Sequence, residues 1–310
     1  MSGLPPVATE LRTSLEVRFV PIRETCRQCR RDLGSCHRGP FMDIKRALPR
    51  PQLRVVVRSF EERRAELGSA VLTWPVAARP HQILNIHLAD PYRVRIDGGP
   101  ANVTPEMSLV GPQTYRRAHV YLSGTVHVFN ILFQPTGLNR LVGINMTCLV
   151  NQDPAASDAL GQSAITLGDA VRAAQDFRER VAAAERWAGM LLDKREPDGA
   201  IDHASRLLIA ARGHARIEEL VGKSGLSTSQ FQRRFATQVG VTPKLYARTI
   251  RFDRALITRR NDPRKPWTEI IHELGYFDQA HFIRECHAFT GLPPRSLTGD
   301  WDNIFFPADD

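Results

Sequence analysis

Three cysteines and a histidine near the start of the chain have the spacing best suited to binding a metal. They follow the pattern Cys26-x2-Cys29-x6-Cys36-His37, which offers three thiolates and an imidazole, a ligand set suited to tetrahedral zinc. A second half-motif, another CxxC or an HxxxH, does not follow, and the neighbouring residues are arginines and turn formers. We therefore expect a poorly ordered basic tail here in preference to a metal site, with a translation start at Met42 as a further alternative.

Four histidines in the first half of the chain are a second candidate for metal chemistry. His81 and His87 lie six residues apart, and His119 and His127 lie eight apart, without a close H-x-H pair or a suitably spaced glutamate. A nucleophile elbow, a P-loop and a dinucleotide-binding glycine pattern are also missing from the sequence. We expect no enzyme and no cofactor, and a metal-dependent enzyme is the alternative.

Residues 49–150 have the pattern of short β-strands separated by turns. Alternating or β-branched runs are divided by turn signals such as Asp97-Gly98-Gly99-Pro100. This spacing predicts an antiparallel β-barrel or sandwich, whose interior can hold one small ligand. The predicted strands are Leu53–Val57, Ile83–Leu88, Tyr92–Ile96 and Val126–Phe133, and further turns are expected at Pro75, Gly111-Pro112 and Ser123-Gly124.

The hydrophobic period becomes helical after residue 160. One apolar stripe with spacings of three and four residues runs from Ala170 to Leu191 and predicts a helix between residues 160 and 196. Its many alanines favour packing within the chain over a coiled coil with a second copy. Pro197-Asp198-Gly199 then predicts a linker, and residues 200–297 are helical with short breaks.

Positive charge is concentrated in two parts of the chain. The net charge is +9; residues 1–64 hold 14 Lys and Arg against 7 Asp and Glu, and residues 200–297 hold 16 against 9. The residues between are nearly neutral, and residues 299–310 form an acidic tail. A basic C-terminal third favours a polyanionic partner such as nucleic acid, although a generally arginine-rich surface is the competing interpretation.

The helical third contains two similar units. Glu219–Pro243 aligns with Glu269–Pro294 once a one-residue insertion is allowed in the second copy. Each unit has a short helix, a glycine turn, a second helix and a Gly-x-x-Pro ending, which is the organisation of a helix-turn-helix. The aligned pairs are Gly225 with Gly275, Phe231 with Phe282, Arg233 with Arg284, Gly240 with Gly291, and Pro243 with Pro294.

The second helix of each unit has an apolar back and a polar front. Ser227 and Gln230 form a capping-box pattern that fixes where the first of these helices begins, and Asp278 is the expected N-cap of the other. The apolar backs are Phe231, Phe235 and Val239 in the first unit and Phe282, Cys286 and Phe289 in the second. The fronts are Ser229, Gln232, Arg233 and Ala236, then Gln279, Ala280, Ile283, Arg284 and His287.

These fronts suit recognition of double-stranded DNA. Glutamine pairs with adenine and arginine with guanine in the major groove, while small or apolar side chains contact the thymine methyl group. The alternative is two ordinary helical hairpins whose polar faces are only solvated. Two such units in tandem, in the basic C-terminal third of the chain, favour DNA binding instead. Between the units, Pro243–Arg260 predicts a rigid connecting helix that sets their separation and lies near phosphates.

The stretches "GLSTSQFQRRFATQVGVTPKLYARTIRFDRA" and "IIHELGYFDQAHFIRECHAFTGLPPRSL" resemble the DNA-binding domain of the AraC/XylS family of bacterial transcription regulators. The resemblance covers residues 203–297, including the connecting helix. It implies that the two second helices enter successive major-groove segments on one face of the DNA. By this resemblance, Ile283, where a small polar residue is common, favours a methyl contact over a hydrogen bond, and Cys286 replaces a usual aromatic residue. The family's base-contacting positions fall here on Ser229, Gln232, Arg233, Gln279, Ala280, Ile283 and Arg284.

The stretch "VHVFNILFQPTGLNRLVG" more weakly resembles the cupin-like N-terminal domains of some family members, which bind an effector or mediate dimerisation. The expected fold is multi-domain: a cupin-like antiparallel β-barrel or sandwich, a helical connector, and an all-α double helix-turn-helix. The expected boundaries are 1–48 for a disordered basic tail, 49–150 for the sensor, 151–199 for the connector, 200–298 for the DNA-binding domain and 299–310 for the acidic tail.

The chain is expected to be a transcription regulator, provisionally classed as an activator, with double-stranded DNA, a small-molecule effector and RNA polymerase as partners; the sequence does not identify the sign of regulation. A homodimer is a further expectation. No run of about 18 apolar residues is present, so no membrane span is expected. Five cysteines, two of them isolated, favour reduced thiols and a cytoplasmic, nucleoid-associated location.

Overall fold

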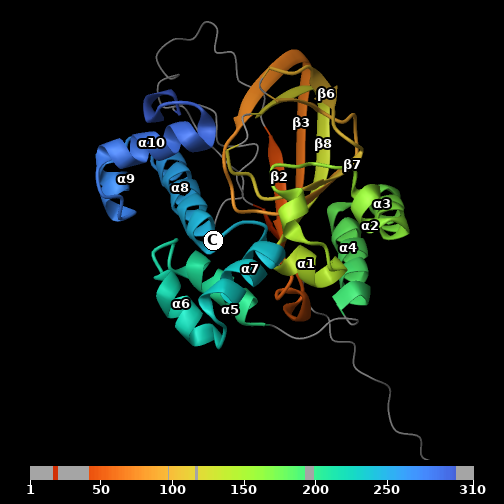
Figure 1. Cartoon of the computed structure of the whole chain (residues 1–310). Coiled ribbons are helices and arrows are strands. Elements are labelled where there is room, and N and C mark those ends of the chain that lie inside the picture. The colour runs from red at the N-terminus through yellow and green to blue at the C-terminus, as the bar shows by residue number, and fades with distance from the viewer. Residues whose placement is uncertain (1–16, 20–41, 97, 116–117, 193–198, 298–310) are drawn as a thin grey trace, which may run out of the picture.

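The computed structural model describes residues 17–19, 42–96, 98–115, 118–192 and 199–297, which form a β-rich domain followed by a helical domain (Figure 1). The expected antiparallel β-domain and all-α helix-turn-helix region are both present. No helix in these ranges is long and apolar enough to cross a membrane. The candidate zinc ligands Cys26, Cys29, Cys36 and His37, like the acidic tail, lie outside the described residues.

The β-rich domain is built on one eight-stranded antiparallel sheet. Its order is β1-β2-β3-β8-β4-β7, with β5 paired to β8 and β6 paired to β5. The long strands β3 and β8 pair along nearly their whole length and form the centre of the sheet. The strands are β1 Val17–Phe19, β2 Asp43–Ala47, β3 Val57–Val76, β4 Ile83–His87, β5 Arg93–Ile96, β6 Ala101–Val103, β7 Met107–Val110 and β8 Ala118–Phe133.

Two positions expected to be turns lie inside the long strands. Pro75 pairs with His119 within β3, and Ser123-Gly124 lies within β8. Gly124 has φ 65° and pairs with Gly68, φ 56°, where the register shifts on the β3 side. Glycines at bulges therefore bend these strands instead of ending them.

The start of the β-domain also differs from the sequence expectation. The predicted strand Leu53–Val57 is wrong. A short 3-10 helix, η2 (Pro51–Leu53), ends at the first residue of this segment, a turn follows, and β3 begins only at Val57. Strand β2 pairs with β3 and lies before the expected boundary at residue 49. The sheet therefore begins earlier than its hydrophobic pattern indicates, because β2 is rich in charged residues.

The helices between residues 137 and 192 cover the outer face of the sheet. Phe60, Phe129 and Ile131 point to that face and pack into one core with residues of α1, α3 and α4, including Val181. Burial of such side chains contributes roughly 1.5–3 kcal/mol each. The helices here are α1 Gly137–Val142, η3 Met146–Leu149, α2 Ala156–Leu160, α3 Gln162–Ala173 and α4 Phe177–Leu192.

The apolar stripe expected on one helix belongs to two. α3 ends at Ala173, and α4 begins at Phe177 after a break in which Asp176 accepts a hydrogen bond from the Glu179 amide (2.9 Å). Asp176 is thus a helix-start signal that the hydrophobic period does not show. The favoured packing within the chain is confirmed, since α4 buries its alanine-rich face in the core of the β-domain and its Arg180 pairs with Glu62 of β3 (2.8 Å).

The turn from β8 into α1 requires a glycine. A Cβ at Gly137 would lie 2.0 Å from the carbonyl oxygen of Val56, which is far inside van der Waals contact. The Phe133-x-Pro135-x-Gly137-Leu138 stretch therefore folds as the sequence predicts, with a strand leading directly into a helix.

The helical domain consists of two units joined by α8. The first unit contains α5 to α7 and the second contains α9 and α10 (Figure 1). The elements are α5 Ala200–Ala210, α6 Ile217–Ser224, α7 Thr228–Val239, α8 Pro243–Asn261, α9 Trp267–Glu273, α10 Gln279–Thr290 and η4 Pro294–Ser296.

The β-domain contacts both helical units. The Ala78 amide donates a hydrogen bond to the Phe289 carbonyl in α10 (3.1 Å), and the Tyr115 ring stacks on the Phe289 ring with centroids 5.6 Å apart. On the other unit, Gln82 Nε2 donates to the Val239 carbonyl at the end of α7 (3.4 Å). The orientation of both units is therefore coupled to the β-domain.

Lowering the pH should destabilise the β-domain through His87. Burial, with a contribution from Arg172, lowers the pKa of His87 to about 4, whereas an unfolded histidine has a pKa near ~6.5. Between about pH 6.5 and pH 4 only the unfolded state takes up the proton on His87, so protonation favours unfolding. The free energy of unfolding therefore falls as the pH drops towards 4, and His87 has no such effect above the unfolded pKa. Urea unfolding at pH 7 and pH 5 should show an extra loss of roughly 2 kcal/mol in the wild type relative to His87→Gln. Equal pH dependence of the two proteins would contradict this assignment.

Candidate nucleic-acid interface

Helix α7 presents the first candidate recognition face. The predicted capping box is confirmed: Ser227 Oγ accepts from the Gln230 amide (3.3 Å), and Gln230 Oε1 accepts from the Ser227 amide (3.1 Å). Gly225 precedes the helix with φ 68°, a conformation that glycine adopts without strain. The predicted back, Phe231, Phe235 and Val239, is fully buried, and the predicted contacts Ser229, Gln232 and Arg233 are exposed together on the front.

Helix α10 presents the second face in the same way. Asp278 is the N-cap, as predicted, and accepts a hydrogen bond from the His281 amide (2.6 Å). Phe282, Cys286 and Phe289 form the buried back, so the cysteine fills the place of an aromatic residue without exposing the core. Of the predicted contacts, Gln279, Ala280 and Arg284 are exposed and Ile283 is half-buried.

Helix α8 is packed into the cores of both units. Tyr246 and Ile250 belong to the core of the first unit, while Phe252 and Leu256 belong to the core of the second. Thr242 caps its start by accepting from the Leu245 amide (3.3 Å). The predicted connecting helix over residues 243–260 is thereby confirmed, and its packing into both cores sets the distance between α7 and α10 in this structure.

A basic cleft of about 830 Å³ opens between the two units. Lys244, Arg248 and Arg251 of α8 line it together with residues from both units, and Glu285 is the one carboxylate among its lining residues. Its further basic lining residues are Arg216, Arg284, His214 and His281. The cleft carries an excess of positive charge and reaches the front of α10 at Arg284, which suits a phosphate backbone.

Hydrogen bonds across the cleft hold the two units together. Arg248 Nε donates to Glu285 Oε1 (2.6 Å), which ties α8 to α10, and the pair keeps the pKa of Arg248 above its ordinary value in spite of the opposing effect of burial. His214 Nε2 lies 2.8 Å from the Leu274 carbonyl, which links the turn between α5 and α6 to the end of α9. The cleft is therefore a fixed feature of the domain.

Phe277 is an exposed residue that sequence reasoning missed. Its side chain is 92% exposed, while the adjacent Tyr276 is buried against Phe282. It immediately precedes the N-cap of α10, next to Gln279 and Ala280. The sequence signal for this exposure was the pair Tyr276-Phe277 between the turn glycine Gly275 and the N-cap Asp278. Two neighbouring side chains in so short a segment cannot both enter the core, so one of them must be exposed.

The candidate metal ligands of the β-domain do not converge. His81 lies against Asp253 of α8 (3.4 Å), His87 against Thr104 (3.3 Å), and His127 near Glu62 (3.6 Å). Among the described residues, no group of three or more His, Cys, Asp or Glu side chains could hold a metal ion.

Comparison with known proteins agrees with the geometry of the helical units. Residues 220–299 match the family model described as "Helix-turn-helix domain". This part of the chain is an AraC-type helix-turn-helix domain. The resemblance found in the sequence is therefore confirmed for a domain whose general property is DNA binding. No curated protein sequence matches the chain.

Several solved structures are similar to this chain at low sequence identity. ToxT from Vibrio cholerae is 9% identical, covers 77% of this chain and 97% of its own, and has a TM-score of 0.44. ToxT from strain SCE256, described as bound to an unsaturated fatty acid, is 9% identical, covers 86% and 97%, and has a TM-score of 0.41. The AraC-like transcriptional activator CuxR is 10% identical, covers 76% and 80%, and has a TM-score of 0.30.

Removing one cation from the cleft should weaken DNA binding without changing its sequence preference. We expect Lys244→Ala to lower affinity similarly on all DNA sequences and to reduce the slope of log affinity against log salt by about 0.9, the value for one lost phosphate contact. Fluorescence anisotropy with duplex DNA at several salt concentrations measures this slope. Arg178→Ala, which removes one exposed charge from α4, is the control and should leave it unchanged. An unchanged slope for Lys244→Ala would place this lysine away from the DNA.

Proposed function

We propose that the protein is a sequence-specific transcription regulator that inserts α7 and α10 into successive major-groove segments. The observation that carries this proposal is the pair of exposed polar fronts on helices whose backs are buried in two cores sharing α8. A helix with an exposed front and a fixed back can enter the groove without unfolding its own domain. The basic cleft supports the proposal, because the backbone between two major-groove segments needs positive charge nearby.

The proposed base contacts follow from the side-chain types on each front. Gln232 and Gln279 suit adenine, and Arg233 and Arg284 suit guanine, because each pair makes two parallel hydrogen bonds. Ala280 and the half-buried Ile283 are apolar and suit thymine methyl groups. Ser229 completes the proposed set through its exposed hydroxyl.

A small-molecule effector bound by the β-domain is the proposed input to regulation. Support comes from the contacts that the β-domain makes with both helical units at Val239 and Phe289. A ligand that alters the β-domain would change the free energy of those contacts and hence the orientation of α7 and α10. Activation through RNA polymerase, a homodimer, and a nucleoid-associated cytoplasmic location stay predictions.

Arginine truncations on the two fronts test the proposed readout. Arg233→Ala and Arg284→Ala should each cost about 1–3 kcal/mol of specific binding and relax the preference at one base position, because each removes a bidentate contact. Sites selected from random DNA by the wild type and by each variant provide the measurement. Arg264→Ala removes an exposed arginine from the turn between α8 and α9 and should leave the selected sequence unchanged. Uniform weakening on every sequence would assign the two arginines to phosphates.

Phe277 should add an apolar contact at the start of α10. We expect Phe277→Ala to lower affinity several-fold and to abolish the preference for thymine at one position beside the Gln279 contact. Replacing single thymines of a selected site by uracil removes only the methyl group. The wild type should lose affinity at one uracil position where Phe277→Ala does not, while Met190→Ala on α4 should behave as wild type. If the wild type and Phe277→Ala both lose affinity at the same uracil position, Phe277 does not make this contact.

A further inference from the structure

One histidine that lines the basic cleft has two ring nitrogens that both face carbonyl oxygens. His214 Nδ1 lies 3.0 Å from the Ala211 carbonyl oxygen, and its Nε2 lies 2.8 Å from the Leu274 carbonyl oxygen. The Ala211 oxygen also accepts from the His214 amide (2.9 Å), which its two lone pairs allow. A carbonyl oxygen only accepts, and a neutral imidazole carries a single N–H donor. Both ring contacts are hydrogen bonds only when the ring carries two protons, so the geometry is that of an imidazolium.

The two carbonyl groups stand at the C-terminal ends of two helices. Ala211 is the C-cap of α5 in the first unit, and Leu274 is the C-cap of α9 in the second unit. The last carbonyl groups of a helix lack partners within that helix and carry a negative partial charge, which favours a cation beside them. One imidazolium therefore completes the ends of two helices that belong to different units.

Two glycines allow the imidazole to lie this close to both units. A Cβ at Gly275, which has φ 59°, would lie 2.8 Å from His214 Nε2. A Cβ at Gly213, which has φ 79°, would lie 2.3 Å from the Ala247 carbonyl oxygen of α8. Both glycines also adopt a left-handed conformation that other residues rarely adopt. The turn that carries His214 is thus seated against the connecting helix and against the end of α9.

Positive charge surrounds His214 on the side of the cleft. The other basic residues that line the cleft come from its own segment, from α8 and from α10: Arg216, Lys244, Arg248, Arg251, His281 and Arg284. These like charges oppose a further positive charge on His214. A DNA backbone that runs along the cleft between two engaged units would offset the repulsion, so the proton on His214 and the DNA favour each other.

The carboxylates nearest the cleft have cationic partners of their own. Glu285 accepts from Arg248 (2.6 Å), and Glu273 at the end of α9 accepts from Lys265 (2.6 Å). Two exposed carboxylates at the start of α6 are not among the residues that line the cleft: Glu218 and Glu219. The imidazolium therefore depends on the two helix-end carbonyl groups and on DNA for its stabilisation.

We propose that His214 is a positioning residue that, as an imidazolium, holds the two helix-turn-helix units in the arrangement that reads DNA. Loss of one proton to solvent leaves a ring nitrogen lone pair against a carbonyl oxygen, and this repulsion separates the turn between α5 and α6 from the end of α9. DNA that engages both α7 and α10 selects the arrangement with both hydrogen bonds, so binding takes up a proton at His214. This inference rests on the proposed function, because it names how reading by two units is stabilised.

The ring protons of His214 test the imidazolium on the full-length protein without DNA. With histidine labelled with nitrogen-15, a correlation spectrum at about pH 6 should show an Nδ1–H and an Nε2–H signal from His214, because hydrogen bonds slow the exchange of both protons with water. His214→Gln assigns the two signals by their disappearance. His203→Gln, at an exposed histidine of α5, should leave both in place. One signal or none from His214 would overturn the proposal.

The pH dependence of DNA binding tests the link between the units. The DNA is a site selected from random sequence, together with the same site in which one of the two blocks is scrambled. From about pH 8 to about pH 6, wild-type affinity for the intact site should rise at least about 5-fold more than that of His214→Gln, and less than this on the scrambled site. Comparison with His214→Gln removes the contributions of His281 and the other histidines, and His203→Gln should behave as wild type.

Two results on these sites would overturn the proposal. An equal extra rise on the intact and scrambled sites would assign His214 to a phosphate contact, and no extra rise on either would remove its role in DNA binding. His214→Arg carries a permanent planar cation with several N–H donors. It should bind the intact site about as tightly as the wild type does at pH 6 and should lose the extra pH dependence.

Site selection on the same preparations separates this inference from the proposed function. A protein that enriches a two-block motif, and whose pH dependence is unchanged in His214→Gln, would lose this inference and keep its role in DNA recognition. A protein that shows both ring N–H signals but enriches no motif from random DNA would lose the proposed function and keep the imidazolium between its two units.

Discussion

The packing of α8 into two cores is the constraint on which the DNA-binding geometry depends. Tyr246 and Ile250 hold it to the first unit, and Phe252 and Leu256 hold it to the second, so neither unit can rotate without exposing part of a core. The Arg248–Glu285 pair and the His214–Leu274 contact reinforce the arrangement from the cleft side. Two recognition helices at a fixed separation can address only DNA whose major-groove segments have a matching separation, which gives specificity beyond that of each helix alone.

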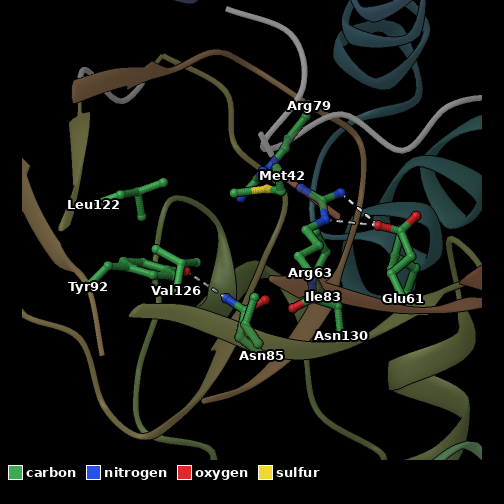
Figure 2. Close-up of a pocket in the computed structure, with 12 residues that line it drawn as sticks. Met42, Glu61, Arg63, Arg79, Ile83, Asn85, Tyr92, Leu122, Val126 and Asn130 are labelled. Atoms are coloured by element: carbon green, nitrogen blue, oxygen red, sulfur yellow. Dashed lines mark hydrogen bonds and ion pairs between the residues drawn. The ribbon is translucent and has the colours of Figure 1, made fainter. Parts of the chain in front are cut away.

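The two faces of the N-terminal sheet carry different kinds of side chain. The outer face is largely apolar and anchors α1, α3 and α4, with Glu62 pairing to Arg180 of α4. The inner face carries the polar row, three buried cross-strand partners shown in Figure 2: Glu61, Asn130 and Asn85. Because side chains alternate along a strand, one sequence can support a stable helical layer and a polar interior at the same time. The contacts with Val239 and Phe289 then connect this domain to both recognition helices. A change inside the sheet thus has a physical route to the DNA-binding surface.

The helix-turn-helix units were largely predictable because their signals are local. The Ser227 capping box, the Asp278 cap and the apolar backs each depend on residues a few positions apart, and all appear in the structure. The β-domain was harder, because turn signals such as Pro75 and Ser123-Gly124 lie inside long strands: only the second half of β8 was expected, and most of β3 was not predicted at all. The polar row was not predictable at all, since Glu61, Asn130 and Asn85 meet only through strand pairing between distant segments. The exposure of Phe277 likewise depends on Tyr276 filling the core beside it.

Selection of bound sites from a random DNA library tests the central claim most directly, because it asks whether two recognition helices at one fixed distance read the DNA. The full-length protein should enrich a motif with two conserved blocks whose centres are separated by about one helical turn, roughly 10–10.5 base pairs, with the same spacing in every site. Enrichment of a single block, of two blocks at variable spacing, or of no motif would contradict it.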